Sequence, residues 1–241
     1  MTILQHLDEL RKSLIRSVIA VAVATALSFV FWHQLMHLLI RPLPGVQLIF
    51  IDLTEMIGTT FRVCLAAGII IAVPYLTYEF IMFVSPALTG KEKKYVFMVL
   101  PWIGLMFAGG VLFSYFVLLP PALKFLGNFG SDIAIPQIRI GNYISIVTRL
   151  MLITGIIFEL PVVTTLLSAL GIVSSRWLAS KRKWAILLAF VVAAIITPTF
   201  DPVNQSLVAV PLIVLYEMSI WLAKIVYKKE NLPVTVESAA P

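Results

Sequence analysis

Six long runs of apolar residues, separated by shorter polar segments, organise the pattern of this chain. The runs cover residues 14–38, 57–84, 95–119, 142–168, 184–197 and 206–226. A helix needs about 20 mainly apolar residues to cross a bilayer. The fifth run would form a helix of only about 21 Å, so we expect it to lie in thinned bilayer or to be sheltered by neighbouring helices. The pattern predicts an all-α polytopic membrane protein with six transmembrane helices, in one membrane domain covering residues 1–228.

The two ends of the chain differ from these runs. Residues 1–13 place apolar side chains on one helical stripe, which is typical of an amphipathic segment lying along the membrane surface. The first apolar run is too long for a cleaved signal peptide, so we expect it to remain as a span. We expect the tail, residues 229–241, to be disordered.

Prolines interrupt three of the predicted helices and most of the connections. Pro74, Pro101 and Pro161 each remove a backbone donor inside an apolar run and are expected to bend the helix. Pro42 ends the first helix, and the β-branched residues after it favour an extended segment or a short outer cap. We therefore expect a bent bundle, with ordered outer connections over residues 39–56 and 120–141.

Composition supports a membrane location, and the distribution of charge predicts an orientation. The chain is 60% hydrophobic and 12% charged, with 18 lysines and arginines and a net charge of +6. The basic residues flank the apolar runs and do not gather on an aromatic face, so we do not expect nucleic-acid binding. Thirteen of the 18 lie at one set of helix ends. Because cytoplasmic loops retain positive charge, both termini are predicted to lie in the cytoplasm.

Three carboxylates fall inside apolar runs, where an ionised group is costly, and are candidates for function: Glu79, Glu159 and Glu217. Simpler interpretations are snorkelling for Glu79 and an interhelical hydrogen bond for Glu217. Glu159 stands out because Pro161 leaves carbonyl groups without donors beside it, which indicates a polar pocket in the cytoplasmic half of the helix. No metal-ligand cluster or phosphate-binding loop is present in the sequence, so we expect neither a metal nor another cofactor.

Five ordered motifs resemble the TatC family, the receptor subunit of the twin-arginine protein translocase. They are "HLDELRKSL" at 6–14, "FVSPALTGKEKK" at 83–94, "FELPV" at 158–162, "TPTFDPVNQ" at 197–205 and "PLIVLYEMSIW" at 211–221. The resemblance implies a bent six-helix bundle with a concave, glove-like face. It also implies a non-enzymatic protein of a bacterial or archaeal-type cytoplasmic membrane.

The resemblance implies roles for particular residues. Glu9 and Glu92 would form the cytoplasmic site for the paired arginines of signal peptides, with Phe83 close to it. Carboxylates suit this task because they accept forked hydrogen bonds from a guanidinium group that an ammonium group cannot reproduce. Further polar or partner-contacting candidates are Pro42, Glu159, Asp201, Gln205 and Glu217.

The implied partners are signal peptides of folded precursor proteins, single-span subunits of the TatA or TatB type, and further copies of the chain, with transport driven by the proton-motive force. Two other classes remain open from the residues alone. A proton-coupled solute transporter could use the three buried glutamates as relays, although its usual repeated halves are absent. A membrane-embedded enzyme would need a nucleophile and base, or a metal set, that the sequence does not show at plausible spacing.

Overall fold

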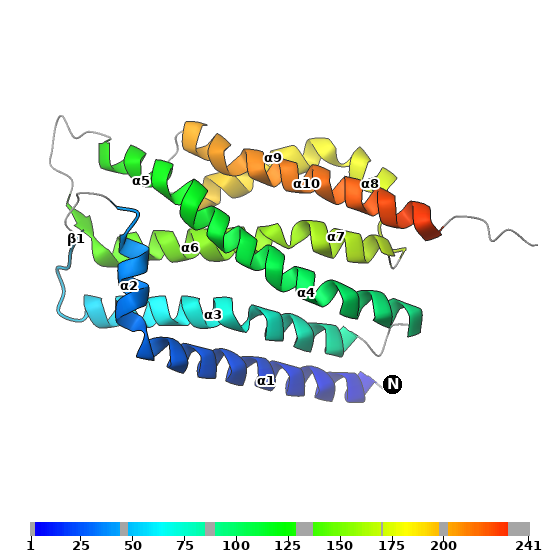
Figure 1. Ribbon diagram of the computed structural model, residues 1–241, viewed down its shortest axis with the longest axis horizontal. Coiled ribbons are helices and arrows are strands. Elements are labelled where there is room, and N and C mark those ends of the chain that lie inside the picture. Colours follow the sequence, from blue (N-terminus) through cyan, green and yellow to red (C-terminus); the bar gives the residue numbers. More distant parts are fainter. Residues whose placement is uncertain are drawn as a thin grey trace, which may run out of the picture.

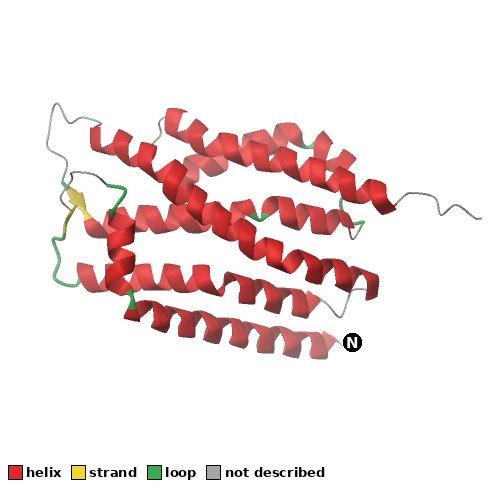
Figure 2. Cartoon of the chain, in the orientation of Figure 1, coloured by secondary structure: helices red, strands yellow, loops and turns green. Residues whose placement is uncertain are grey.

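Almost every described segment of the chain is helical. The computed structural model describes residues 3–43, 48–84, 90–128, 137–169, 171–197 and 202–230. Figures 1 and 2 show long helices running in roughly one direction, with a small pair of strands at one end. The elements are α1 (Ile3–Val30), α2 (Trp32–Ile40), β1 (Leu48–Ile49), α3 (Glu55–Val84), α4 (Gly90–Phe113), a π-helical turn η2 (Ser114–Leu118), α5 (Leu119–Asn128), β2 (Ile138–Arg139), α6 (Ile140–Phe158), α7 (Leu160–Ala169), α8 (Ser175–Ser180), α9 (Arg182–Ile196) and α10 (Pro202–Glu230).

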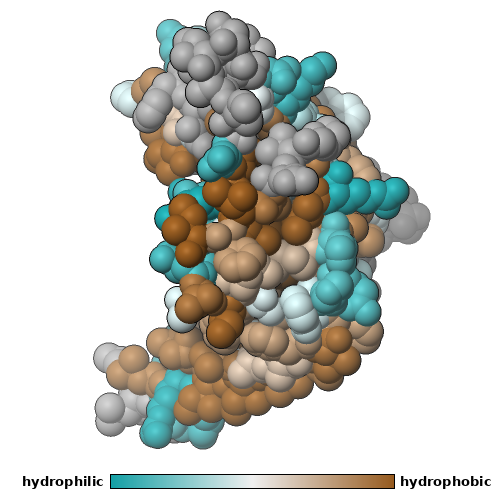
Figure 3. Space-filling view, turned by 90° about the vertical axis from the view of Figure 1, so that its left-hand side faces the viewer, coloured by the Kyte–Doolittle hydropathy of each residue, from teal (hydrophilic) through white to brown (hydrophobic). Residues whose placement is uncertain are grey.

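The helices pack as neighbours across the bundle. α1 lies along α3, α3 contacts α4 and α6, α4 contacts α6 and α7, and α10 packs on α7, α8 and α9. The largest cluster of buried apolar residues includes Met36, Tyr143, Leu150 and Ala193 and joins the helices around the β1–β2 end. Two much smaller clusters, around Ile103 and Ile220, hold other parts of the bundle. Seen from the β1–β2 end, the molecule has a curved outline (Figure 3).

All six predicted apolar runs are helical, and five of the helical segments are long and apolar enough to cross a membrane. Within the described residues these are His6–Val30, Glu55–Phe83, Val99–Asn128, Ile140–Ser168 and Gln205–Ile225. The sixth run forms α9, which has 15 residues and packs along α10. At about 1.5 Å per residue it is about 22 Å long, shorter than a typical hydrocarbon core. α9 buries Ala189, Ala193 and Ile196, whereas Trp184, Leu188 and Ile195 are exposed, so neighbouring helices shelter only one side of this short segment.

The amino-terminal end differs from the expected surface segment. α1 runs without interruption from Ile3 to Val30, so the residues up to 13 continue the first span and do not turn away from it. No glycine or proline occurs between Ile3 and Val30 to end a helix. The first span also stops earlier than residue 38, because the chain turns at Phe31 and α2 crosses the end of α3 (Figure 1).

The fourth apolar run contains the break expected at Pro161. α6 ends at Phe158 and α7 begins at Leu160, with Glu159 at the junction. The Glu159 amide donates to the Ile156 carbonyl at 3.1 Å, a reach of three residues where an α-helix spans four. Pro161 has no amide hydrogen to continue the regular ladder. The helix is therefore wound more tightly at Glu159, the carboxylate that the sequence indicates as unusual.

The third apolar run continues further than expected. Helix persists through Pro120 and Pro121 to Asn128, a segment predicted to be part of an outer loop. The π-helical turn η2 precedes these prolines, and the Leu119 amide donates to the Ser114 carbonyl five residues back. A wider turn shifts the hydrogen-bonding register just where two successive donors are missing. The helix can thus pass through a proline pair that would break a regular α-helix.

The described parts of the two outer connections meet in a cap; residues 44–47 and 129–136 of the connections predicted to be ordered lie outside the described residues. β1 pairs with β2 in parallel, with Leu48 opposite Ile138. The Arg139 guanidinium reaches the carboxylates of Asp52 at 2.8 Å and Glu55 at 3.0 Å. These contacts, chiefly with Glu55, raise the pKa of Arg139 above its usual value, so the guanidinium stays charged. The cap thus joins two connections that are about 90 residues apart in the chain.

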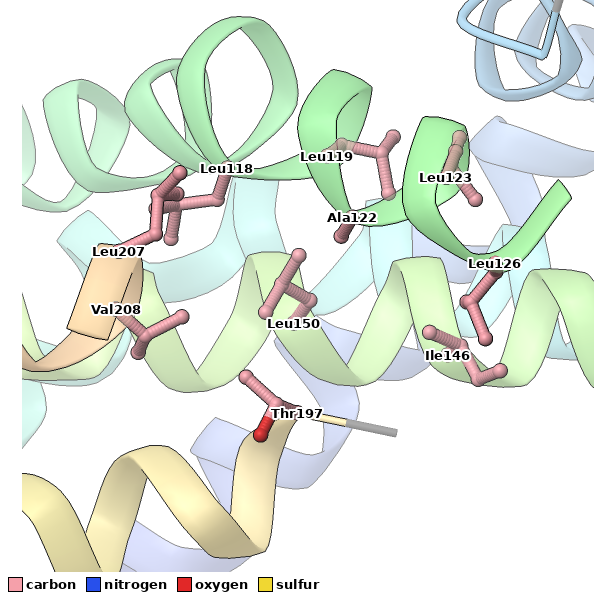
Figure 4. A pocket seen from close by; sticks show the side chains of 10 residues that line it. All are labelled: Leu118, Leu119, Ala122, Leu123, Leu126, Ile146, Leu150, Thr197, Leu207 and Val208. Atoms are coloured by element: carbon pink, nitrogen blue, oxygen red, sulfur yellow. The ribbon is translucent and has the colours of Figure 1, made fainter. Parts of the chain in front are cut away.

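A small apolar cavity lies between α5, α6 and α10 beside the end of α9. It has a volume of about 10 Å³, close to the least that can hold one water molecule. Figure 4 shows leucine side chains such as Leu119 and Leu150 pointing into it. The hydroxyl of Thr197, the polar side chain in its lining, donates to the Ala193 carbonyl. The cavity is a packing defect without a free polar group for a ligand.

Candidate functional site

The most enclosed carboxylate of the described residues is Glu79, which is 2% exposed and lies between α1 and α3. Ser13 donates from Oγ to Glu79 Oε2 at 2.7 Å, and Tyr75 donates from its hydroxyl to Oε1 at 2.7 Å. The Arg16 guanidinium lies 3.3 Å from Oε2. Two hydroxyl donors and one cation therefore compensate the buried charge. Glu79 does not snorkel, which corrects the simpler interpretation of the sequence.

The same two helices bring Phe83 to the amino-terminal part of α1. The ring of His6 stacks on Phe83, with 4.5 Å between the centroids and 23° between the planes. His6, Glu9 and Ser13 follow each other at spacings of three and four residues, so they share one stripe of α1. Because His6 contacts Phe83 and Ser13 contacts Glu79, Glu9 lies on the stripe that faces α3, between these two contacts.

Glu9 differs from its neighbour Asp8. Asp8 lies on another side of α1 and pairs with Lys12 at 2.6 Å, with both side chains largely exposed. Glu9 is half-buried, and within the described part of the chain it has no salt bridge. Glu9 thus shares its stripe of α1 with His6, and the described residues supply no cation to its carboxylate.

The structure describes two of four further predicted residues, Pro42 and Gln205, in full. Glu92 belongs to the first turn of α4, and its side chain lies outside the described residues. Asp201 also lies outside them. Pro42 is half-buried in the turn after α2. Gln205, near the start of α10, donates from Nε2 to the Phe190 carbonyl of α9 at 3.0 Å and so ties these helices together.

Glu159 has an environment unlike that of Glu79. Both carboxylate oxygens are buried; the backbone of Phe107 lies close, but no described residue gives either oxygen a hydrogen bond of ordinary geometry. The helices approach closely here: a Cβ added to Gly110 of α4 would lie 2.9 Å from the Cα of Gly155 on α6. Glu159 therefore sits beside a tight helix crossing, as an acidic group with unfilled hydrogen-bonding capacity.

Glu217 forms an interhelical ion pair. The Arg182 guanidinium donates from Nε to Oε1 at 2.7 Å and from Nη2 to Oε2 at 2.9 Å. This forked contact joins α9 to α10, and both side chains are about half exposed. The interhelical hydrogen bond considered from the sequence is the arrangement found. Glu79 and Glu217 thus have separate partners and Glu159 has no hydrogen-bond donor of ordinary geometry, so the three glutamates form no connected relay among the described residues.

Sequence reasoning missed the residues that surround Glu79. Tyr75 lies four residues before Glu79, a spacing that places both on one face of α3, and this signal was available. Ser13 and Arg16 come from α1, and their meeting with Glu79 depends on the register between two helices. Nothing in the local pattern of either helix specifies that register.

These features define a class of protein: a polytopic helical membrane protein with carboxylates where its α1 and α3 helices pack and a cap of paired strands at one end. The family model for "Sec-independent protein translocase protein (TatC)" matches residues 5–211. The TatC of Aquifex aeolicus is 40% identical over 96% of this chain and 98% of its own. The TatC of Carboxydothermus hydrogenoformans is 38% identical over 95% of this chain and 96% of its own. The chloroplastic TATC of Arabidopsis thaliana is 36% identical over 93% of this chain and 67% of its own.

Solved structures agree with these relatives. A crystal structure titled as the twin-arginine translocase receptor TatC superposes with a TM-score of 0.80 at 40% identity, covering 92% of this chain and 99% of that one. A second, in DDM, has a TM-score of 0.82 at 41% identity, with 90% and 99% covered. The chain belongs to the TatC family. It is a multi-pass membrane component of the Sec-independent twin-arginine translocase and not an enzyme, so the enzyme and solute-transporter alternatives are set aside.

Proposed function

We propose that this chain is the receptor that captures twin-arginine signal peptides of folded precursor proteins on the cytoplasmic side of the membrane. Glu9 and Glu92 are the proposed carboxylates for the two guanidinium groups. The observation that carries the proposal is the half-buried Glu9, unpaired within the described residues, on the stripe that also presents His6 to Phe83. A guanidinium group can accept this environment because it stacks on an aromatic face while it donates to a carboxylate.

The Glu79 cluster supports this role by positioning. Ser13 lies one helical turn after Glu9 and is fixed to Glu79 at 2.7 Å, so α1 cannot slide along α3 without breaking that contact. A rigid carboxylate loses less conformational freedom on binding than a mobile one. The proposed site is thus built on two locked helices.

The remaining steps of the proposal concern partners and energy. After capture, the chain organises single-span subunits of the TatA or TatB type and further copies of itself into a translocation path driven by the proton-motive force. Gln205, Asp201, Pro42 and Glu217 are proposed contacts in this assembly. The described helices of this bundle pack directly against one another, which supports a path for folded proteins that is shared with other subunits.

The test is crosslinking of a twin-arginine peptide to the purified full chain carrying Glu9→Ala or Glu92→Ala. Each substitution removes one or more charge-assisted hydrogen bonds of about 1.5–3 kcal/mol, so we expect affinity to fall about tenfold to hundredfold. Asp8→Ala is the matched control, because Asp8 is the adjacent carboxylate and pairs with Lys12 away from α3. A Lys-Lys peptide should bind the unsubstituted chain as weakly as the Arg-Arg peptide binds the variants. Equal crosslinking by Glu9→Ala, Glu92→Ala and Asp8→Ala would rule the proposal out.

A further inference from the structure

A lateral groove between α7, α8, α9 and α10 is not used by the function proposed above. It has a volume of about 400 Å³ and is bordered mainly by apolar side chains, including Leu160, Leu188 and Val192. Leu188 and Leu160 are also exposed on the surface of the bundle, so the groove opens sideways. In a membrane protein such an opening faces lipid or another membrane-embedded helix, because no water is available to fill it.

One end of the groove carries features of a membrane–water interface. Trp177 and Trp184 line it there, and tryptophan is enriched at the level of lipid headgroups. Tyr216 lies at the same groove with its hydroxyl committed to the Leu178 carbonyl at 2.8 Å. The groove therefore extends from an aromatic belt towards the apolar interior.

Lys181 is the one charged residue among the described residues that border the groove. Its ammonium group lies 6.0 Å from the centre of the Trp177 ring, and no described acidic side chain pairs with it. The nearby Arg182 is already occupied by both oxygens of Glu217. Lys181 also precedes the first turn of α9, whose amino terminus has no side-chain cap and carries the positive end of the helix dipole. This end of the groove has an excess of positive charge.

We propose that the groove binds an anionic phospholipid, with an acyl chain between α7 and α9 and the phosphate at Lys181. Size favours a lipid chain over a partner helix. A volume of 400 Å³ is in the range of small-molecule sites, whereas 15 residues of helix, about 22 Å long and about 10 Å across, occupy several times that volume. The unpaired cation selects a negatively charged headgroup over a zwitterionic one. The inference does not depend on Glu9, Glu92 or signal-peptide capture.

The experiment uses the fluorescence of Trp184 in a full-length variant whose other four tryptophans are replaced by phenylalanine, in nanodiscs of phosphatidylcholine. Dibrominated phosphatidylglycerol or dibrominated phosphatidylcholine is added as the quencher. We expect dibrominated phosphatidylglycerol to quench Trp184 at a mole fraction about fivefold lower than dibrominated phosphatidylcholine does. This is the factor expected for one lysine at an anionic surface. Lys181→Gln should abolish this preference. Lys183→Gln, a change of the same charge at an exposed residue that does not border the groove, should retain it.

A second variant that keeps only Trp102 reports on ordinary lipid contact, because Trp102 is exposed on α4 away from the groove. We expect Trp102 to show no preference between the two lipids. Native mass spectrometry of the chain with all five tryptophans, comparing lipid adducts of Lys181→Gln and Lys183→Gln, avoids the tryptophan substitutions. Equal effects of the two lysine variants would overturn the proposal. So would quenching of Trp184 by dibrominated phosphatidylglycerol no stronger than that of Trp102, because the groove would then hold this lipid no better than the open surface of the bundle does.

Discussion

At the scale of single residues, three carboxylates are accommodated in one apolar bundle in three ways. Glu79 is enclosed by donors from α1 and α3, and Glu217 is held by a guanidinium fork between α9 and α10. The carboxylate oxygens of Glu159 are buried without an ordinary hydrogen bond from the described residues. Sequence alone identified all three as unusual, since charge inside an apolar run is visible in the pattern. It singled out Glu159 beside Pro161, but it could not name the partners of Glu79 and Glu217, because Ser13, Arg16 and Arg182 come from other helices.

Glu159→Gln is predicted to separate capture from later steps. The substitution keeps the size of the side chain and removes its ability to ionise, and Glu159 lies at the α6–α7 junction, far along the chain from the Glu9 stripe. We expect signal-peptide crosslinking within about twofold of the unsubstituted chain, the spread of a peripheral change. Export of a folded precursor by membrane vesicles is expected to fall severalfold. Loss of capture as large as that of Glu92→Ala would place Glu159 in the primary site.

At the scale of elements, the position of a proline in the sequence did not determine whether the helix breaks there. Pro161 coincides with a break between α6 and α7, whereas Pro74 and Pro101 lie inside continuous helices. Pro120 and Pro121 follow the π-helical turn and do not end the helix. The apolar pattern predicted where helices exist, because it reports on the solvent around them. It could not predict how a missing donor is accommodated, which depends on the packing of the next turn.

Close packing of α1 on α3 leads to a prediction for Gly68. A Cβ at Gly68 would lie 2.7 Å from the backbone nitrogen of Thr25, and a backbone atom cannot move aside cheaply. Gly68→Ala is therefore expected to destabilise the protein by about 1–3 kcal/mol through overpacking. Gly58→Ala is the matched control in the same helix, because nothing lies within 4 Å of its added Cβ. Thermal unfolding of both variants in detergent checks this, and equal midpoints would contradict the close approach.

At the scale of the whole molecule, charge distribution and fold agree on two distinct ends. The β1–β2 cap and the Glu55–Arg139 contact lie at one end of the bundle, and the amino terminus of α1 lies at the other (Figure 1). The positive-inside pattern assigns the amino-terminal end to the cytoplasm, as an expectation from the sequence. The course of the helices between these two ends could not be predicted from charge alone, because the curved shape of the bundle depends on contacts between helices.

The orientation can be tested by thiol labelling, because Cys64 is fully buried and gives a silent background. Leu53→Cys introduces a thiol into the outer cap, where the native side chain is 92% exposed, and Arg176→Cys introduces one at the opposite end. A membrane-impermeant maleimide should label only Leu53→Cys in spheroplasts and mainly Arg176→Cys in inverted vesicles. The reverse pattern would place the termini outside the cytoplasm.

The outer cap also sets an order for the biogenesis of the protein. The carbonyls of Leu38 and Leu39, at the end of α2, accept hydrogen bonds at 2.7 Å from the hydroxyls of Tyr115 and Tyr143. The backbone groups of β1 likewise cannot pair until β2 has been synthesised. Since domains are synthesised from the amino terminus, the Leu38 carbonyl lacks its tyrosine partner until residue 115 has emerged, and the Leu39 carbonyl lacks its own until residue 143 has emerged. A ribosome that stalls before this point therefore leaves an amino-terminal hairpin that is inserted but unfinished, exposing unmet backbone groups to chaperones and membrane proteases.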